Sequence, residues 1–266
     1  MVLVENPPII NLTLIQGDCM DVFPTLKDES INLIFADPPW NVGKEYYVVQ
    51  DDRHDYLEWC EHWIKECFRV LKTNGSFYLI NTLENSYELY FIMKKYGLFQ
   101  TTIIWFKRVN PTPLKNGFPN IFSPILFFTK SKLFYFDSLN RIDFELKSKG
   151  DCITHQLYNV WLDIPKVVSG IFSDEAILDK EQKMVLPNQL PIKLLERIIK
   201  CSCPNNGIVL DPFAGTGTTL EASIKLSRNC VGIEIDPKLC CTIKERVFSK
   251  RFLNKFIHHE FKEFVE

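Results

Sequence analysis

Short apolar runs alternate with amphipathic segments along most of the chain. The runs are rich in β-branched residues, as strands buried on both faces of a sheet are. The segments between them place apolar residues at helical spacing. This alternation predicts an α/β fold whose mostly parallel sheet has helices on both faces. The pattern predicts strands at 12–15, 31–36, 76–80, 99–106, 125–129, 208–210 and 230–235, and helices at 20–26, 56–71, 84–95, 192–201, 220–227 and 237–264, with Asn74 and Gly75 ending the second helix.

Four acidic residues directly follow predicted strands: Asp18, Asp37, Asp211 and Glu234. Ligands of open parallel sheets bind at the carboxyl ends of the strands. If these strands share one sheet, the four carboxylates converge on one rim, and we expect a ligand site there.

Residues 211–219 form a small-residue loop between a predicted strand and a predicted helix. Gly215 and Gly217 can adopt positive φ and let the backbone approach a ligand. The following helix would offer free N–H groups. Gly-Thr-Gly also occurs in many ordinary turns. The interpretation as a nucleotide-type site gains support from Glu234, an acid at the end of the next strand, where a ribose-binding carboxylate is expected.

Asp37, Pro38, Pro39 and Trp40 follow the predicted strand at 31–36. The prolines fix φ and lack N–H donors, so nearby carbonyl groups can point at a ligand. Asp37 and the Pro38 carbonyl can accept two hydrogen bonds from one NH2 group, and Trp40 can stack on a heterocycle. This suits an exocyclic amine on a base removed from its stack. The alternative is a Pro-Pro turn beside a core tryptophan.

Composition and charge narrow the class of protein. The 266 residues carry a net charge of -2, but residues 94–149 hold ten basic side chains against three acidic ones. This basic middle predicts a phosphate-facing surface or an ordinary solvated face. The nine cysteines lack zinc-binding spacing, so we expect buried thiols and no metal. No signal peptide or membrane-spanning run is evident, and a soluble cytoplasmic protein is expected.

These motifs together resemble the β group of amino-methylating DNA methyltransferases, which use S-adenosylmethionine. The catalytic motif Asp37–Trp40 comes first and the cofactor loop 211–219 last. Residues 105–107 and 110–113 resemble a segment lining the target-base pocket, and 188–191 resembles part of the family's H-P-T-Q-K-P. The resemblance implies cofactor contacts from Asp18, Cys19, Asp37, Gln189, Asp211, Phe213, Ala214, Gly215, Thr216, Gly217, Thr218, Thr219 and Glu234.

The resemblance covers the chain except about residues 131–185. It implies a Rossmann-like sheet of seven strands in a catalytic domain formed by residues 1–130 and 186–266, with 131–185 inserted as a target-recognition region. Two segments depart from the family. Residues 186–191 lack its His, Thr and Lys, which affects the cofactor site, and 122–126 lack an acid that many relatives carry in the base pocket.

The implied activity is site-specific methyl transfer to the N6 amine of adenine in double-stranded DNA. An Asp at the start of the motif favours adenine, with cytosine-N4 as the alternative base. An RNA N6-adenine methyltransferase and a non-catalytic DNA-binding relative are further alternatives. Lys107, Arg108 and Lys115 are the candidate DNA contacts. A homodimer and a cognate restriction endonuclease are the protein partners that such a role would allow.

Overall fold

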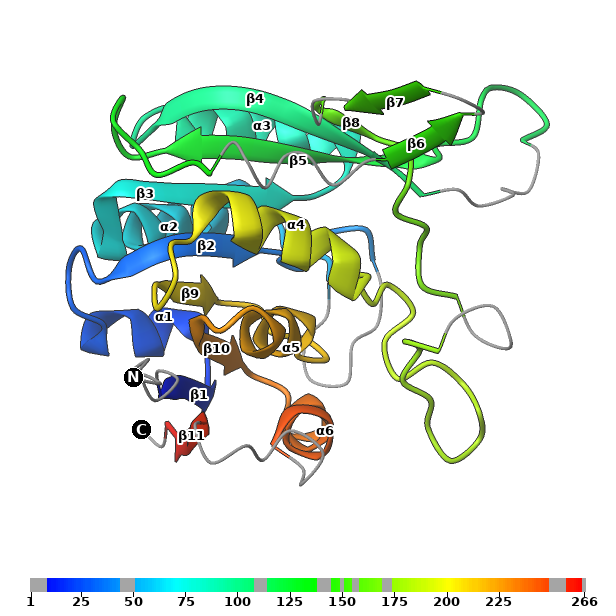
Figure 1. The fold of residues 1–266 in the computed structure, drawn as a ribbon. Coiled ribbons are helices and arrows are strands. Elements are labelled where there is room, and N and C mark those ends of the chain that lie inside the picture. Colours follow the sequence, from blue (N-terminus) through cyan, green and yellow to red (C-terminus); the bar gives the residue numbers. More distant parts are fainter. Residues whose placement is uncertain are drawn as a thin grey trace, which may run out of the picture.

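The computed structural model describes residues 9–43, 51–107, 114–137, 145–148, 151–154, 158–168, 174–248 and 257–264. Its main sheet has the strand order β11-β1-β10-β9-β2-β3-β5-β4-β8 (Figure 1). Only β5 runs antiparallel to its neighbours in this sheet. The strands are β1 (Ile10–Gln16), β2 (Ile31–Ala36), β3 (Leu71–Ile80), β4 (Leu98–Phe106), β5 (Phe122–Thr129), β8 (Val160–Trp161), β9 (Ile208–Asp211), β10 (Asn229–Glu234) and β11 (Ile257–Glu263).

The predicted class is confirmed, and all seven predicted strands are present. Two further strands, β8 and β11, extend the sheet at its two edges. β2 is buried at every position, because helices cover both of its faces. The strands predicted from apolar runs are therefore those inside the sheet. Burial on both faces makes their sequences apolar throughout, which is the pattern that the prediction uses.

The helices lie on the two faces of this sheet, and each face has its own apolar core. α1 (Cys19–Val22), α2 (Tyr56–Val70) and α3 (Leu83–Met93) pack on one face around Trp63 and Phe77. α4 (Ile192–Ser202), α5 (Thr218–Lys225) and α6 (Pro237–Val247) cover the other around Leu194 and Leu220 (Figure 1). None of the helices described is long and apolar enough to cross a membrane.

Two predicted helix ends are wrong. The final helix ends at Val247, and residues 257–263 form β11, which pairs in parallel with β1. The side chains of β11 alternate between half-buried and exposed, with Ile257, His259 and Phe261 on the covered side. Asn74 and Gly75 lie inside β3, because α2 ends at Val70. At Gly75 a Cβ would lie 2.6 Å from Leu71 Cδ1, so close packing explains this glycine.

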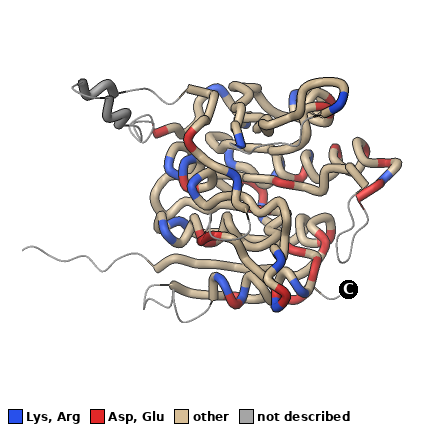
Figure 2. Tube along the Cα trace, turned by 90° about the vertical axis from the view of Figure 1, so that its right-hand side faces the viewer, with Lys and Arg blue, Asp and Glu red and all other residues tan. Residues whose placement is uncertain are grey.

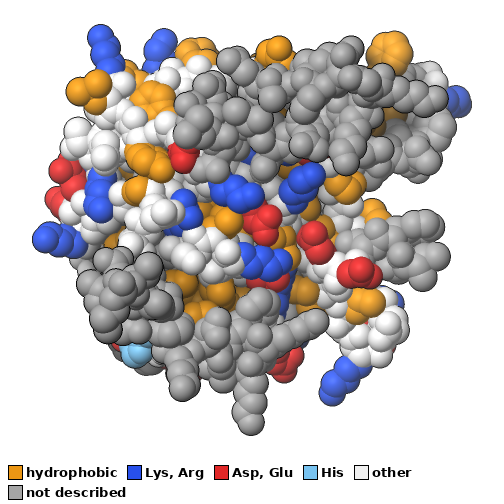
Figure 3. Space-filling model, viewed as in Figure 1, with side chains coloured by type: hydrophobic (Ala, Val, Ile, Leu, Met, Phe, Trp, Pro, Cys, Tyr) orange, Lys and Arg blue, Asp and Glu red, His pale blue; other side chains and the backbone are white. Residues whose placement is uncertain are grey.

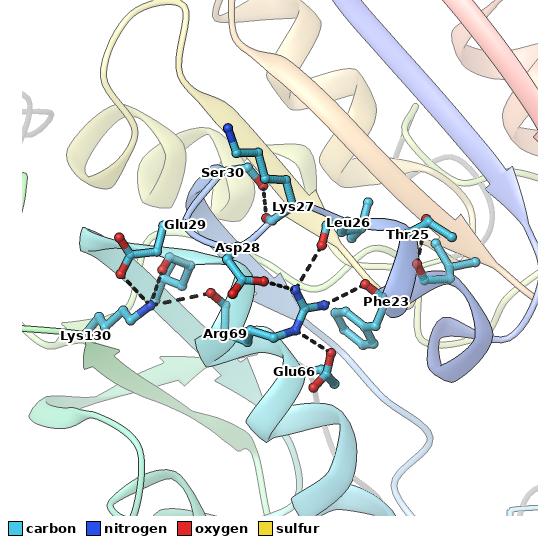
Figure 4. Close-up of polar contacts among 12 residues, drawn as sticks. Phe23, Thr25, Leu26, Lys27, Asp28, Glu29, Ser30, Glu66, Arg69 and Lys130 are labelled. Carbon is cyan, nitrogen blue, oxygen red and sulfur yellow. Dashed lines mark hydrogen bonds and ion pairs between the residues drawn. The ribbon is translucent and has the colours of Figure 1, made fainter.

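A polar cluster fixes the segment that leads into β2 (Figure 4). The Arg69 guanidinium donates to the carbonyls of Phe23 (2.7 Å) and Leu26 (2.9 Å) and pairs with Glu66 and Asp28. Lys130 from the end of β5 donates to the Leu71 carbonyl at 2.8 Å. Because Asp37 directly follows the carboxyl end of β2, this cluster fixes the opposite end of the strand that leads to Asp37.

The predicted target-recognition region, 131–185, is described only in parts. β6 (Glu145–Ser148) and β7 (Asp151–Thr154) form a separate antiparallel hairpin. β8 pairs with β4, and Trp161 and Ile164 join the main core. This segment therefore contributes to the core of the sheet domain, while its role and boundaries stay predictions.

Candidate active site

A cavity of about 760 Å³ opens where β1, β2, β9 and β10 end, at the edge that faces the viewer in Figure 2. The four predicted rim carboxylates, those of Asp18, Asp37, Asp211 and Glu234, all line it. Charges of both signs surround this edge (Figure 2). Of the predicted catalytic and cofactor residues, only Gly217 does not line the cavity. The predicted residues that do are Asp18, Cys19, Asp37, Pro38, Pro39, Trp40, Gln189, Asp211, Phe213, Ala214, Gly215, Thr216, Thr218, Thr219 and Glu234.

The Asp-Pro-Pro-Trp segment is held by hydrogen bonds from two helices. The Tyr56 hydroxyl of α2 donates to the Pro39 carbonyl at 2.8 Å, and Asn81 donates to that hydroxyl at 2.9 Å. Asn85 of α3 donates to the Trp40 carbonyl at 2.7 Å. These bonds fix the two carbonyls that follow Pro38.

Within the segment, the Trp40 indole N–H donates to Asp37 Oδ1 at 2.8 Å. This bond orients the ring and the carboxylate together. No donor in the described part of the chain reaches the Pro38 carbonyl. Among the described residues the Pro38 carbonyl therefore has no donor, and Pro38 and Asp37 both line the cavity.

The glycine loop joins β9 to α5 through two left-handed residues. Gly215 has a φ of +54° and Gly217, the N-cap of α5, a φ of +81°, conformations that favour glycine. A Cβ at Gly217 would also lie 3.1 Å from Ile243 of α6. Gly217 thus shapes the turn and allows α6 to pack closely, whereas Gly215 lies at the cavity.

Burial changes the acidity of two rim carboxyls. Burial raises the pKa of Glu234 to about 7, although hydrogen bonds from the backbone N–H groups of Asp236 (2.9 Å) and Gly215 (2.7 Å) lower it. Burial likewise raises the pKa of Asp211 to about 6, against hydrogen bonds from Thr219 and the Phe213 N–H. Clustered buried carboxyls with raised pKa values indicate a polar ligand site.

The altered segment 186–191 forms an apolar wall of the cavity through Leu186 and Pro187. Gln189 is 1% exposed, and its amide is paired with main-chain groups. Its Nε2 donates to the Glu175 carbonyl at 2.6 Å, and its Oε1 accepts from the Ile177 N–H at 3.1 Å. Gln189 therefore joins residues 175–177 to the cavity wall.

Several cavity residues were not predicted from the sequence. Asp51, which is 2% exposed, accepts from the backbone N–H groups of Asn41 and Val42 and so closes the loop after Trp40. Trp59 packs edge-on against Phe213 at 5.8 Å. The helical period of residues 56–71 predicts that Trp59 lies on a helix, but not that it reaches the cavity. For Asp51, nothing in the surrounding sequence distinguishes it from an acidic residue of a solvent-exposed loop.

The candidate DNA contacts lie near the β4–β5 hairpin. Lys107 Nζ lies 5.7 Å from the centre of the Trp40 ring. Lys115 is exposed in the segment that joins β4 to β5, as is Phe118, which is 99% exposed. Arg108 and residues 110–113 lie outside the described residues. The face around α4 mixes basic and acidic side chains (Figure 3), so it is not a uniformly basic surface.

Comparisons with known proteins identify relatives of this chain. The chain is 33% identical to the type II methyltransferase M.HinfI of Haemophilus influenzae over 88% of this chain and 68% of that protein. It is 32% identical to the DNA adenine methyltransferase YhdJ of Escherichia coli over 84% of this chain and 78% of that one.

Solved structures share the fold. The protein TTHA0409 of Thermus thermophilus, complexed with S-adenosyl-L-methionine, matches with a TM-score of 0.63 and 20% identity over 93% of this chain and 98% of that chain. The cytosine-N4-specific PvuII DNA methyltransferase matches with a TM-score of 0.67 and 19% identity over 92% and 90%. The family profile described as "DNA methylase" matches residues 31–245, so this chain belongs to the N6/N4 family of DNA methyltransferases.

Proposed function

We propose that this protein transfers a methyl group from S-adenosylmethionine to the N6 amine of adenine in double-stranded DNA, as part of a restriction-modification system. The observation that carries the proposal is the pair of acceptors at Pro38 and Asp37. Tyr56 and Asn85 hold the neighbouring carbonyls, and the Pro38 carbonyl has no donor in the described chain. An NH2 group has two N–H donors, and the Asp37 carboxylate and the Pro38 carbonyl would each accept one.

The chemistry requires a better nucleophile than a free base offers, because the lone pair of the amine is delocalised into its ring. Hydrogen bonds from the two N–H groups to Asp37 and the Pro38 carbonyl would concentrate electron density on the nitrogen. Trp40, held by its bond to Asp37, would stack on the extruded base, a contact of about 1–3 kcal/mol. As the N–C bond formed, the bond between the methyl carbon and the sulfonium sulfur would break and S-adenosylhomocysteine would be the leaving group. The methylated amine would then lose one proton to solvent, and positioning would carry the rate.

The remaining cavity fits the methyl donor. S-Adenosylmethionine, when bound, supplies the methyl group from its sulfonium centre. Glu234 lies at the end of β10, where its carboxylate can accept from the two ribose hydroxyl groups. Gly215 lets the backbone approach the amino-acid part of the cofactor, and Phe213 and the apolar wall at Leu186 can cover its less polar surfaces.

DNA would approach from the side of the β4–β5 hairpin. Lys107 lies beside Trp40, and Lys115 is exposed in the segment between β4 and β5, so both can contact phosphates near an extruded base. Arg108 lies between them in the sequence and is the third proposed contact. We assign target recognition to the segment 131–185.

Cytosine-N4 transfer is the second candidate, because the PvuII enzyme with the same fold is specific for that amine. Adenine is preferred because the motif begins with Asp and because YhdJ, an adenine methyltransferase, aligns over most of this chain. Both bases offer an exocyclic NH2 on a flat ring, so the two acceptors alone do not separate them.

The test is methylation of native bacteriophage DNA by the purified protein with tritiated cofactor, followed by separation of the nucleosides. We expect label in N6-methyldeoxyadenosine. Label confined to N4-methyldeoxycytidine would overturn the choice of adenine as the base. Stronger labelling of an RNA competitor than of the DNA would overturn the choice of DNA as the substrate. The Asp37→Asn variant should lose at least about 100-fold in rate, whereas Asp21→Asn, an exposed acid of α1, should keep full activity.

A further inference from the structure

The chain turns directly after Trp40 in a backbone conformation that is uncommon for its residue type. Asn41 has a φ of +55°, in the left-handed region that residues with a side chain seldom adopt. Asparagine tolerates this region better than most residues, but the conformation still costs free energy. Such a conformation persists only where neighbouring contacts hold it, and it is found most often at functional sites.

Asp51 holds together the two ends of the loop that begins at Asn41. Its carboxylate accepts from the N–H of Asn41 through Oδ1 and from the N–H of Val42 through Oδ2, the latter at 3.1 Å. Its carbonyl accepts from the Gly43 N–H at 2.7 Å. The Asn41 side chain donates in turn to the Arg53 carbonyl at 3.0 Å. The left-handed turn is therefore held by Asp51, which is 2% exposed, and by the main chain that follows it.

The contacts of Asp51 require a side chain with two acceptor atoms. A carboxylate offers both of its oxygen atoms, whereas the amide of asparagine has one acceptor and one NH2 donor. In an Asp51→Asn variant, one of the two backbone N–H groups would face a donor in place of its acceptor. That N–H group would be left unpaired, which is unfavourable. Aspartate at position 51 is thus matched to the turn at Asn41.

One peptide group connects this turn to Trp40. The carbonyl of Trp40 and the N–H of Asn41 belong to the same planar unit. Asn85 donates to that carbonyl at 2.7 Å, and Asp51 accepts from that N–H. Both polar atoms of the peptide group are therefore held, so its plane has a fixed orientation. This orientation limits the position of the Trp40 ring, whose indole N–H is bonded to Asp37.

We propose that Asp51 is a positioning residue for methyl transfer, which acts through the peptide group between residues 40 and 41 to hold Trp40 against the extruded base. The inference rests on the proposed function, because the orientation of Trp40 affects the rate only if a base stacks on it. Asp51 lines the same cavity as Trp40. Both of its carboxylate oxygens accept from the main chain, so its assigned contribution is to orient Trp40.

Replacing Asp51 by asparagine tests this role in transfer. With native bacteriophage DNA and tritiated cofactor, Asp51→Asn should lower kcat by about 10–100-fold, because misplacement of a reacting group by about 1 Å has an effect of this size. The affinity for S-adenosylhomocysteine, measured by titration calorimetry, should stay within about twofold, since the proposed cofactor contact at Glu234 lies on β10. Asp52→Asn, an exposed change at the next residue, should have the wild-type kcat.

The orientation of Trp40 can also be observed without any measurement of activity. The chain has five tryptophans, so labelling with fluorotryptophan gives a fluorine NMR spectrum simple enough to assign. Trp40→Phe identifies the resonance of Trp40 by its disappearance. We expect Asp51→Asn to shift or broaden this resonance and to leave those of Trp105 and Trp161, on the other core, unchanged. Asp52→Asn should leave the whole spectrum unchanged.

A matched pair of substitutions at Asn41 tests the turn without changing Asp51. Asn41→Gly and Asn41→Ala both remove the side-chain bond to the Arg53 carbonyl, but only glycine adopts a positive φ freely. Asn41→Ala should therefore reduce kcat at least about fivefold more than Asn41→Gly does. Circular dichroism should show that every variant keeps the helix content of the wild type.

Wild-type kcat for Asp51→Asn, or an unchanged Trp40 resonance in that variant, would overturn the proposal. Equal losses of kcat and of S-adenosylhomocysteine affinity, or equal kcat values for the two Asn41 variants, would also overturn it. A wild-type protein that transfers no methyl group to DNA would overturn the proposed function instead, and the fluorine spectra would still decide whether Asp51 holds Trp40.

Discussion

Replacing Glu234 by glutamine changes the charge of the proposed cofactor site with almost no change in shape. In the folded protein the carboxylate accepts from the N–H groups of Gly215 and Asp236. Burial nevertheless raises the pKa of Glu234 from an ordinary value of 4.5 to about 7. Near neutral pH, ionised Glu234 is therefore a buried charge that lowers the stability of the folded protein.

The sign of the pH dependence follows from proton binding. Below pH 4.5, Glu234 is protonated in the folded and the unfolded chain, so it adds no pH dependence. Between pH 4.5 and about 7, the folded protein holds a proton that the unfolded chain has lost, so the free energy of unfolding falls as pH rises. Across this interval the free energy of unfolding falls by about 3 kcal/mol. The loss is complete above pH 7.

The Glu234→Gln variant lacks this titration. Its amide cannot accept from both backbone N–H groups, which costs about 1–3 kcal/mol at every pH. We therefore expect the free energy of unfolding of the variant, relative to the wild type, to rise by up to about 3 kcal/mol between about pH 5 and pH 8. Urea unfolding followed by tryptophan fluorescence measures this difference. Glu245→Gln, an exposed change on α6, should show no such rise.

Cofactor affinity should have the opposite pH dependence, because the ionised carboxylate is the better acceptor for ribose hydroxyls. Titration calorimetry of the wild type should show S-adenosylmethionine binding more tightly as pH rises from about 6 to 8. The Glu234→Gln variant should bind about 10–100-fold more weakly at the upper pH and lose the pH dependence. Wild-type affinity for the variant at every pH, or an unchanged stability difference, would refute this account of Glu234.

Three further changes test other parts of the structure. Tyr56→Phe leaves the Pro39 carbonyl without its donor. The free energy of unfolding should therefore fall by about 1–3 kcal/mol, and the turnover rate should fall as well. Tyr158→Phe should change neither quantity. Arg69→Ala removes the bonds to two carbonyls and should lower the unfolding midpoint without changing the turnover of folded protein, as measured by urea titration and initial rates. Lys115→Ala should weaken DNA binding on all sequences and reduce the slope of log affinity against log salt by about 1.

The central strands and the carboxylates at the carboxyl edge of the sheet could be predicted from the sequence, because both depend on local patterns. Runs that are buried on both faces are apolar throughout, and an acid directly after such a run lies at the carboxyl edge of the sheet. Asp37, Asp211 and Glu234 could be placed at one cavity from these signals alone. β11 was not predicted, because its alternation of half-buried and exposed residues includes many polar side chains. Such a sequence also fits a surface helix with both apolar and charged residues.

The hydrogen-bond partners could not be predicted, because packing brings them from distant elements. Tyr56 and Asn85 reach the Asp37–Trp40 segment across 17 and 45 positions of sequence. Asp51 reaches Asn41, the residue after that segment, across ten positions. Two of the predicted cofactor residues also make structural contacts that the sequence does not reveal. Gly217 forms the turn and packs against α6, and the amide of Gln189 pairs with the backbone at 175 and 177.

The geometry of the Asp37–Trp40 segment, proposed as catalytic, depends on two helices that pack on the same face of the sheet. Tyr56 of α2 donates to the Pro39 carbonyl, and Asn85 of α3 donates to the Trp40 carbonyl. The position of α3 depends in turn on Leu89, Ile92 and Met93, which are buried. A shift of α3 by about 1 Å would move Trp40 and misplace the base, and misplacement on this scale can cost about 100-fold in rate. Changes in the packing beneath α3 would therefore act on turnover through the Asn85–Trp40 hydrogen bond, although they touch no residue of the cavity.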